Sequence, residues 1–165
     1  MYIDKRPLVA LGLGSNLGDS RRLILEAIKA LEELLSELRT ASFYETEPLY
    51  VTDQARFINT VVTGFFSVSP GELMQCINDI ESRLGRDRSQ ERRWGERYLD
   101  IDILLFGDLV VREPGLEIPH PRLNERRFAL EPLLELLPEA TEPGSGLSYR
   151  NICQALPSQG CKKLL

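Results

Sequence analysis

Residues 98–106 alternate between apolar and acidic side chains and read Tyr98-Leu99-Asp100-Ile101-Asp102-Ile103-Leu104-Leu105-Phe106. Such alternation predicts a β-strand, because successive side chains of a strand point to opposite faces of the sheet. Leu99, Ile101 and Ile103 then share one face. Asp100 and Asp102 share the other, with their Cα atoms about 6.6 Å apart at a rise of roughly 3.3 Å per residue. The stretch therefore predicts a strand that presents two neighbouring carboxylates.

The sequence before this strand predicts a first strand and a first helix. Residues 7–13 are an apolar run that leads into a turn with glycines at positions 12, 14 and 18. Asp19 can cap the helix that follows. The apolar side chains of that helix recur at helical spacing and are Ile24, Ile28, Leu31, Leu35 and Leu38. This stripe must face a sheet.

Two further strands and a second helix are predicted before the acidic strand. Residues 40–46 and 57–66 are rich in β-branched and aromatic side chains, and a polar segment joins them, which favours an antiparallel pair. Residues 69–72, Ser-Pro-Gly-Glu, have the form of a capping box with proline at the first helical position. The apolar stripe of the second helix is Leu73, Ile77, Ile80 and Leu84.

The segment after residue 106 predicts shorter elements. Gly107 and Asp108 form a turn into a strand at 109–112, Asn124 can cap a short helix through Leu130, and a separate turn begins at Pro132. The order β-α-β-β-α-β predicts a ferredoxin-like α+β sandwich, with helices on one face of the sheet and added C-terminal elements. The sequence has neither an internal repeat nor a linker, so we expect residues 1–165 to form one domain.

Composition and charge narrow the classes of function. The formal net charge of −5 disfavours a general nucleic-acid binder. No apolar run approaches the roughly 18 residues that span a bilayer, and the N-terminal residues lack the order of a signal peptide. Cys76, Cys153 and Cys161 show no C-x-x-C spacing, so we expect reduced thiols, with Cys76 in the core. We expect a cytoplasmic monomer that binds neither nucleic acid nor membranes.

A basic island precedes the acidic strand. It contains six arginines, Arg83, Arg86, Arg88, Arg92, Arg93 and Arg97. Guanidinium groups stay charged and pair bidentately with phosphate oxygens, so the island suits a small polyanion. A solvated charged loop is the alternative, and it stays open for Arg83, Arg88 and Arg92. Arg93 and Arg97 are the stronger candidates because they flank Trp94-Gly95 and lead into the acidic strand.

The two carboxylates beside this island predict a metal site. An isolated D-x-D pair is more often a solvent-facing strand edge. Like charges side by side destabilise a sheet unless something neutralises them, however, and the arginines supply the other half of a nucleotide site. Two Mg²⁺ ions roughly 3.5 to 4 Å apart would stabilise the attacking and leaving oxygens of an in-line displacement. We therefore favour the metal interpretation.

A longer pattern resembles that of a known enzyme family. Residues 93–107 resemble the signature R-W-G-x-R-x-x-D-[LI]-D-I-L-x-[FY]-G of the hydroxymethyldihydropterin pyrophosphokinases. Residues 13–18, 44–49, 57–59 and 118–128 resemble the family's G-S-N-[LM] motif, its pterin-side loop, its F/Y-x-N element and its P-H-P-R-x-x-x-R-x-F element, in the family's order. The resemblance implies transfer of pyrophosphate from ATP to 6-hydroxymethyl-7,8-dihydropterin, with release of AMP, in folate biosynthesis.

The resemblance also implies roles for single residues. Asp100 and Asp102 would hold two Mg²⁺ ions, while Arg86 and Arg97 would contact the polyphosphate and assist the transfer. The residues that serve ATP would be Glu81, Arg93, Trp94, Ile103, His120 and Arg126. The residues that bind the pterin would be Thr46, Leu49, Phe57, Asn59 and Phe128, with the two aromatic rings stacked on the heterocycle. Considered singly, Phe57 and Phe128 are more often core residues, and His120 between two prolines is equally a turn residue.

Some positions depart from the family pattern and leave roles open. The stretch from Arg88 to Arg93 is one residue longer than in some members, so Arg88 and Arg92 receive no role, and neither do the adenine and ribose contacts. The loop 85–96 lacks apolar anchors and is expected to order as a lid over the phosphates.

Two other classes of function are alternatives to the pyrophosphokinase. Another magnesium-dependent phosphotransferase would also use D-x-D and arginines, but no G-x-x-x-x-G-K-[ST] or G-x-G-x-x-G motif is present. A regulatory binding module of the same fold is the non-enzymatic alternative. Such a module has no need of two adjacent carboxylates that face an arginine loop.

Overall fold

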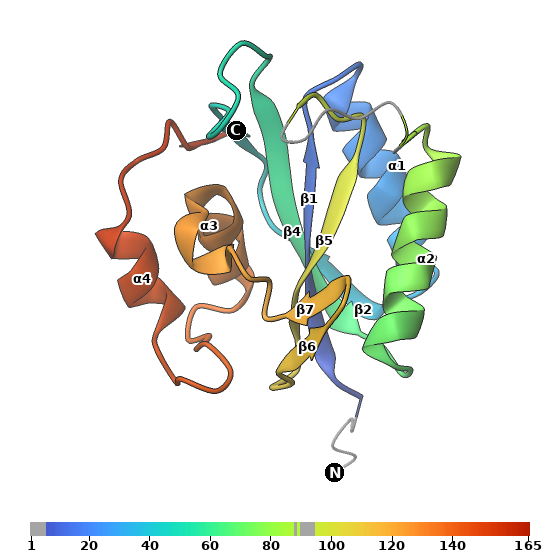
Figure 1. Cartoon of the computed structure of the whole chain (residues 1–165), viewed down its shortest axis with the longest axis vertical. Coiled ribbons are helices and arrows are strands. Elements are labelled where there is room, and N and C mark those ends of the chain that lie inside the picture. Colours follow the sequence, from blue (N-terminus) through green and yellow to red (C-terminus); the bar gives the residue numbers. More distant parts are fainter. Residues whose placement is uncertain (1–5, 88, 90–94) are drawn as a thin grey trace.

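The sheet is built around β1 (Leu8–Ser15), which is antiparallel to a neighbour on each edge. One neighbour is β4 (Phe57–Phe65) and the other is β5 (Asp100–Phe106), as Figure 1 shows. The computed structural model describes residues 6–87, 89 and 95–165. The outer strands are β2 (Ser36–Thr40), β3 (Tyr44–Thr46) and β8 (Lys162–Lys163). β2 and β3 both pair with β4, which confirms the predicted antiparallel pairing, and β8 extends the sheet beyond β3.

Two helices cover one face of the sheet, α1 (Ser20–Glu32) and α2 (Pro70–Arg83) (Figure 1). Both begin where the sequence predicts. The Asp19 side chain accepts a hydrogen bond of 3.1 Å from Arg22 N, and Ser69 and Glu72 form a complete capping box. The core between these helices and the sheet includes Leu11, Leu13, Ile24, Leu31, Leu73, Ile77, Ile101 and Ile103.

The opposite face is covered by α3 (Arg127–Leu136) and α4 (Tyr149–Ala155) (Figure 1). A second core lies there and includes Ala10, Val61, Leu104, Leu130, Leu133 and Tyr149. The prediction of helices on one face thus holds for α1 and α2, while the added C-terminal elements bury the other face. Because both faces are covered, β1 and β4 are buried almost throughout.

A small hairpin and a helical turn connect β5 to α3. The hairpin consists of β6 (Val111–Glu113) and β7 (Leu116–Ile118), and the turn is the 3₁₀ helix η1 (Leu123–Glu125). Between them His120 N donates a hydrogen bond of 3.0 Å to Leu104 O. This bond fixes the segment that carries His120 against the edge of β5.

Several predicted boundaries were wrong at the first helix and the strand after it. α1 ends at Glu32, so Leu35 follows the helix and Leu38 lies in β2. The predicted strand 40–46 is interrupted at residues 41–43. At the interruption the Thr60 hydroxyl lies 3.0 Å from Ala41 O and 3.1 Å from Ser42 O, so it can donate a hydrogen bond to either carbonyl.

The first strand is also longer than predicted. Gly12 and Gly14 lie inside β1 and not in the turn that follows it, where Gly18 adopts a positive φ of 72°. The side chain of Leu104, on the neighbouring strand β5, fills the space above Gly12. Cys76 is only half-buried on α2, contrary to its expected place in the core.

The C-terminal helical region also differs from prediction. One helix, α3, runs through Pro132 where two short elements were expected. Proline removes one backbone hydrogen bond, but Pro132 and the leucines around it are buried, and this burial offsets the loss. Asn124 does not cap the helix, because its Nδ2 donates to Glu142 Oε1 at 2.7 Å. Arg126 occupies the N-cap position without a capping side-chain bond.

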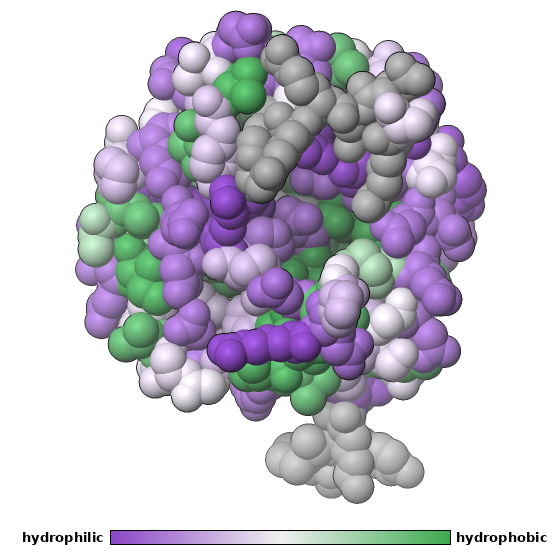
Figure 2. Space-filling model, viewed as in Figure 1, coloured by the Kyte–Doolittle hydropathy of each residue, from purple (hydrophilic) through white to green (hydrophobic). Residues whose placement is uncertain are grey.

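Most of the face shown in Figure 2 is hydrophilic, with apolar side chains in scattered patches. Among the described residues, none of the helices combines the length and apolar character that crossing a bilayer requires.

Candidate active site

The two carboxylates of β5 face the side of the sheet on which β1 carries glycines. Gly12 is the cross-strand partner of Asp102, and Gly14 is the partner of Asp100. Because glycine has no side chain, nothing from β1 covers the two acids. The side chains of Asp100 and Asp102 are 31% and 32% exposed, while the alternate residues of β5 are buried. The predicted orientation of the strand is confirmed.

Arg86 is held beside Asp100 by a buried carboxylate. Its Nη1 lies 2.7 Å from Asp100 Oδ1 and 2.6 Å from Glu81 Oε1. Glu81, in the last turn of α2, is 1% exposed and also accepts a hydrogen bond of 2.7 Å from Ile101 N. A charge this deeply buried must be paired, so Glu81 fixes Arg86 between α2 and β5. Glu81 thus acts on the site through Arg86.

Arg126 and His120 stand beside Asp102. Arg126 Nη1 lies 3.3 Å from Asp102 Oδ2, and His120 Nε2 lies 3.6 Å from the same oxygen. His120 Nδ1 accepts a hydrogen bond from Arg122 N at 3.1 Å, which places the ring proton on Nε2. Burial, together with the charges of Arg126 and Arg122, lowers the pKa of His120 to about 4. The imidazole is therefore neutral near pH 7 and presents an N–H toward the acidic pair.

The acidic pair fits a hard divalent cation. Burial, reinforced by the charge of Asp100, raises the pKa of Asp102 to about 7, although Arg126 opposes the shift. A bound cation would remove the repulsion that raises this pKa. Among the residues that the structure describes, no cluster of three or more His, Cys, Asp or Glu side chains could hold a metal alone. Mg²⁺ suits such a site, because it commonly takes one or two carboxylates and completes its shell with water and substrate phosphates.

One cleft joins the acidic pair to a pocket of mixed polarity. Its empty space is about 820 Å³, including the solvent-exposed mouth. Asp100, Asp102, Arg97 and Arg126 line one part of it. The same cleft is also lined by all five residues that the resemblance assigns to the pterin, which are Thr46, Leu49, Phe57, Asn59 and Phe128.

Asn59 is fixed at the floor of this pocket. Its Nδ2 donates a buried hydrogen bond of 2.8 Å to Thr46 Oγ1. Its Oδ1 lies where β1 leaves room for it, because a Cβ at Gly14 would come within 2.7 Å of this oxygen. Glycine at position 14 is therefore required by the amide of Asn59, which a strand pattern alone does not reveal.

The two aromatic rings reach the pocket from different elements. Phe57 begins β4, and Phe128 lies in the first turn of α3. Both are half-buried and line the cleft, so neither is an interior core residue, although Phe128 packs on the edge of the second core. The Arg126 guanidinium carbon lies 5.7 Å from the centre of the Phe128 ring.

Asn16 joins two loops at the mouth of the cleft. Its Nδ2 donates to Gln54 Oε1 and to Ala55 O, both at 3.0 Å. Its Oδ1 accepts a hydrogen bond of 2.9 Å from Arg97 N. Asn16 lies in the G-S-N-[LM] motif of residues 13–18, but the sequence predicts no role for it. The signal that could have found it is a buried amide in the turn after the first strand.

Three of the expected nucleotide residues either point away from the cleft or lie outside the described part of the chain. The Ile103 side chain packs in the core against α1 and α2, so only its backbone can approach a ligand on the acidic face. Arg93 and Trp94 lie outside the described residues, and so do the other residues of the expected lid at positions 88 and 90–92.

The fold and the cleft define a class of protein: an α+β domain with a carboxylate pair and arginines beside a pocket lined by two aromatic rings, as a phosphotransfer enzyme requires. Residues 10–138 match the family described as 7,8-dihydro-6-hydroxymethylpterin-pyrophosphokinase (HPPK), and the chain belongs to this family.

Individual relatives agree with this family. The 2-amino-4-hydroxy-6-hydroxymethyldihydropteridine pyrophosphokinase of Aquifex aeolicus is 42% identical over 135 residues, which are 82% of this chain and 83% of that protein. The protein of the same name from Bacillus subtilis is 41% identical over 128 residues, 76% of this chain and 75% of that protein. The mitochondrial folate synthesis bifunctional protein of Pisum sativum is 39% identical over 144 residues, 87% of this chain but only 28% of that protein.

Solved structures share the fold. The crystal structure of wild-type Plasmodium falciparum HPPK-DHPS superimposes with a TM-score of 0.71 at 17% identity, covering 93% of this chain and 45% of that one. At this identity the likeness shows the fold alone, and it confirms the predicted ferredoxin-like α+β sandwich with its C-terminal additions.

Proposed function

We propose that this chain transfers the pyrophosphoryl group of ATP to the hydroxymethyl oxygen of 6-hydroxymethyl-7,8-dihydropterin and releases AMP, a step of folate synthesis. Membership of the family supports the reaction. The observation that carries the proposal is the shared cleft, because Asp100 and Asp102 open into the same space as Asn59 and the two aromatic rings. An acceptor bound in the pocket would lie beside the phosphates that it attacks.

The pocket side of the cleft would hold the pterin. Phe57 and Phe128 would stack on the two faces of the ring, and an amide can both donate to and accept from a heterocycle edge, which suits Asn59. Thr46 and Leu49 would complete the pocket through backbone groups. Because Thr46 also accepts from Asn59 Nδ2, it sets the direction in which the amide oxygen points.

The acidic side would hold the polyphosphate. Two Mg²⁺ ions bound by Asp100 and Asp102 would neutralise charge on the β-phosphoryl group and on the leaving oxygen. Arg86 and Arg97 would steady the charge that spreads over the transferred group, with Glu81 holding Arg86 in place. Neutral His120 would donate from Nε2 to a phosphate oxygen, and Arg126 would pair with another. Ile103 would contribute its backbone, and Arg93 and Trp94 would close the nucleotide side, as the resemblance implies.

We also propose that residues 1–165 act as one domain and as a monomer in the cytoplasm. The support for a single domain is that residues from Gly12 to Ala129 line one cleft. Sedimentation of the purified protein with and without substrates tests the monomer. Cell fractionation tests the compartment, since the name of the pea relative places that protein in mitochondria.

The decisive experiment is product analysis. ATP and Mg²⁺ are incubated with the enzyme, with and without hydroxymethyldihydropterin, and the nucleotides are separated. The proposal requires AMP in amounts equal to the pterin consumed. ADP as the product would instead indicate attack at the γ-phosphorus and overturn the proposal.

Methylene analogues of ATP sharpen this test. An analogue bridged between the α- and β-phosphorus should bind without reacting, because the bond to be broken is replaced. An analogue bridged between β and γ should retain some transfer. Turnover of the α,β-bridged analogue would leave only a generic magnesium-dependent phosphotransferase.

A further inference from the structure

The C-terminal segment lies beyond residues 10–138, which match the family. It nevertheless contacts Glu47, which lines the cleft, and Arg127, whose two neighbours in the sequence line it. After α4 the chain turns at Gln159 and Gly160, both with positive φ, and then pairs with the edge of the sheet as β8. Two consecutive residues in the left-handed region define a fixed turn. The segment 156–165 is called the strap below.

Gln159 bonds to the turn from which α3 begins. Its Oε1 accepts a hydrogen bond of 2.9 Å from Arg127 N, and its Nε2 donates one of 2.8 Å to Glu125 O. The first backbone N–H groups of a helix have no partner within the helix, and the N-cap residue usually supplies one. Arg126, at the N-cap position, makes no such bond. A glutamine 32 residues away along the chain therefore caps α3.

Arg127 holds the strap in return. Its Nη1 donates to Leu156 O at 2.9 Å, and its Nε lies 2.5 Å from Glu131 Oε1 one turn along α3. The backbone N–H and the side chain of Arg127 thus both donate hydrogen bonds to the strap. These two bonds fix the position of the strap relative to the first turn of α3.

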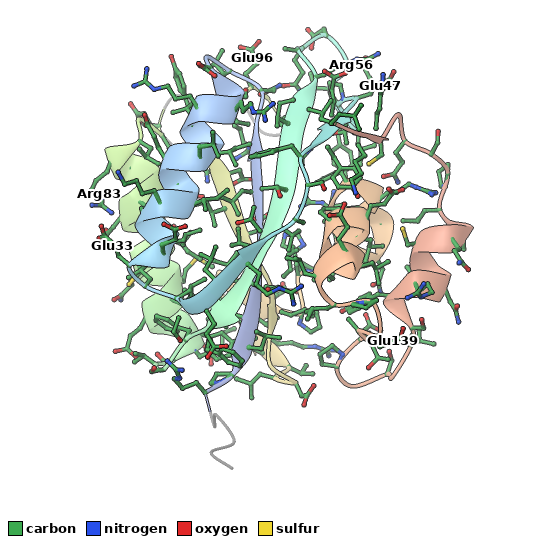
Figure 3. All side chains as sticks on the ribbon, turned by 180° about the vertical axis from the view of Figure 1, so that it is seen from behind. Glu33, Glu47, Arg56, Arg83, Glu96 and Glu139 are labelled. Carbon is green, nitrogen blue, oxygen red and sulfur yellow. The ribbon has the colours of Figure 1, made fainter. Side chains whose placement is uncertain are left out.

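The strap also touches the opposite side of the pocket. Gly160 is packed so closely against Glu47 that an added Cβ would lie 2.8 Å from Glu47 Cγ. Glu47 lines the cleft and pairs with Arg56, its neighbour in Figure 3, at 3.4 Å. β8 then pairs with Tyr44 and Glu45 of β3, the strand that ends at Thr46. One short segment therefore joins the start of α3 to β3.

Two residues beside the groups that Gln159 binds reach the cleft. Arg126 lies between the two backbone groups that Gln159 binds, and its Nη1 contacts Asp102. Phe128 is the next residue but one and lines the pocket. Gln159 itself does not line the cleft.

We propose that Gln159 is a positioning residue: by capping α3 from the strap, it sets the place of Arg126 and Phe128 relative to Asp102 and the pterin pocket. This inference rests on the proposed function for the identity of the ligand. It concerns binding geometry, and Gln159 takes no part in the chemical step.

The test compares two variants, one that loses the cap of α3 and one that loses the cap of α2. Gln159→Met keeps the length of the side chain and removes both hydrogen bonds, whereas Gln159→Glu keeps an acceptor for Arg127 N. Ser69→Ala removes the cap of α2, which follows the end of β4 remote from Phe57. Gln154→Met makes the same substitution on the exposed surface of α4.

Each protein is assayed for AMP formation with both substrates varied, well below its unfolding temperature. Loss of either cap should lower the melting temperature by about 3 to 5 °C. Gln159→Met should also raise the KM for the pterin roughly fivefold, whereas Ser69→Ala and Gln154→Met should stay within about twofold of wild type. Gln159→Glu keeps the acceptor for Arg127 N but loses the donor to Glu125 O, so it should recover only part of the loss. Equal kinetics in Gln159→Met and Ser69→Ala at equal loss of stability would overturn the proposal.

A second variant and an amide-exchange measurement test the cap independently of how well Gln159→Met folds. If Gln159→Met does not fold, Gln159→Asn makes the same comparison with a side chain one methylene too short, and an unchanged pterin KM then overturns the positioning role. Amide exchange at Arg127 is measured without substrate and should be faster in Gln159→Met. A wild-type protein that forms no AMP refutes the proposed function, while unchanged exchange at Arg127 refutes the cap.

Discussion

Replacing Glu135 by glutamine tests the polar contact that joins β3 to α3. Glu135 accepts hydrogen bonds from the Tyr44 hydroxyl and, at 3.0 Å, from Ser42 N, and Lys163 Nζ lies 3.0 Å from its Oε1. Burial opposes the ionisation of Glu135, but these partners outweigh it and lower the pKa of the carboxyl to about 2. The charged form is therefore stabilised by folding.

The size of this stabilisation follows from the pKa difference. The difference from the ordinary value of 4.5 corresponds to roughly 3 kcal/mol. Because 25% of the side chain stays exposed, solvent screens part of it, and we expect about 2 kcal/mol. A carboxyl with a depressed pKa contributes stability above its unfolded pKa and loses it as the pH falls through the folded pKa. The contribution should be complete above about pH 5 and disappear toward pH 2.

Urea unfolding of wild type and Glu135→Gln across this pH range checks the reasoning. The variant should be about 2 kcal/mol less stable at pH 7, and the difference should shrink steadily between pH 4.5 and pH 2. Glu139→Gln is the control, because Glu139 is 91% exposed and should change stability by less than about 0.5 kcal/mol. A loss that is the same at pH 7 and pH 2.5 would show that the charge of Glu135 contributes nothing.

Three further predictions concern the cleft. Asp102→Asn should lower turnover at least a hundredfold, about 2.7 kcal/mol in barrier, and abolish Mg²⁺-dependent thermal stabilisation by ATP; turnover above a tenth of wild type would refute its metal role. Gly14→Ala should displace the Asn59 amide, because the new Cβ meets Asn59 Oδ1 at 2.7 Å. In a fluorescence titration, the affinity of Gly14→Ala for the pterin should fall about tenfold, while its affinity for the nucleotide should not change. An equal loss of affinity for both ligands would contradict this mechanism. Asn16→Ala should cost about 2 kcal/mol of stability in urea unfolding and raise KM for both substrates, since it frees Arg97 N and the loop at Ala55; a change for only one substrate would argue against a shared support.

Local features of the chain were predictable because a single strand or helical turn contains them. The alternation of residues 98–106 placed both carboxylates on one face of β5. The caps at Asp19 and Ser69 located the starts of α1 and α2. The family motifs named residues that do line one cleft, including Asn59 and Phe128. Each of these signals depends on side-chain type and spacing over a few residues.

The errors arose where distant groups compete with local preference. Asn124 was a plausible cap, but its amide bonds to Glu142. A separate turn was expected to begin at Pro132 after a helix through Leu130, yet burial of the residues around Pro132 keeps α3 continuous. At the break at residues 41–43, the hydroxyl of Thr60, about 18 residues further along, can donate a hydrogen bond to a backbone carbonyl. In each case a bond or a buried surface from another element outweighs a local preference of about 1 to 3 kcal/mol.

By itself the sequence determined the order of the core elements, the two faces of β5 and the chemical types gathered for phosphate and pterin. Only the tertiary structure decided which groups meet. It places Arg126 on Asp102, ties Asn16 to Arg97, and brings Gln159 to the start of α3. These partners lie 24, 81 and 32 residues apart. Local patterns carry no information on such pairs, because their closeness results from the burial of both sheet faces and from the need of each buried polar group for a partner.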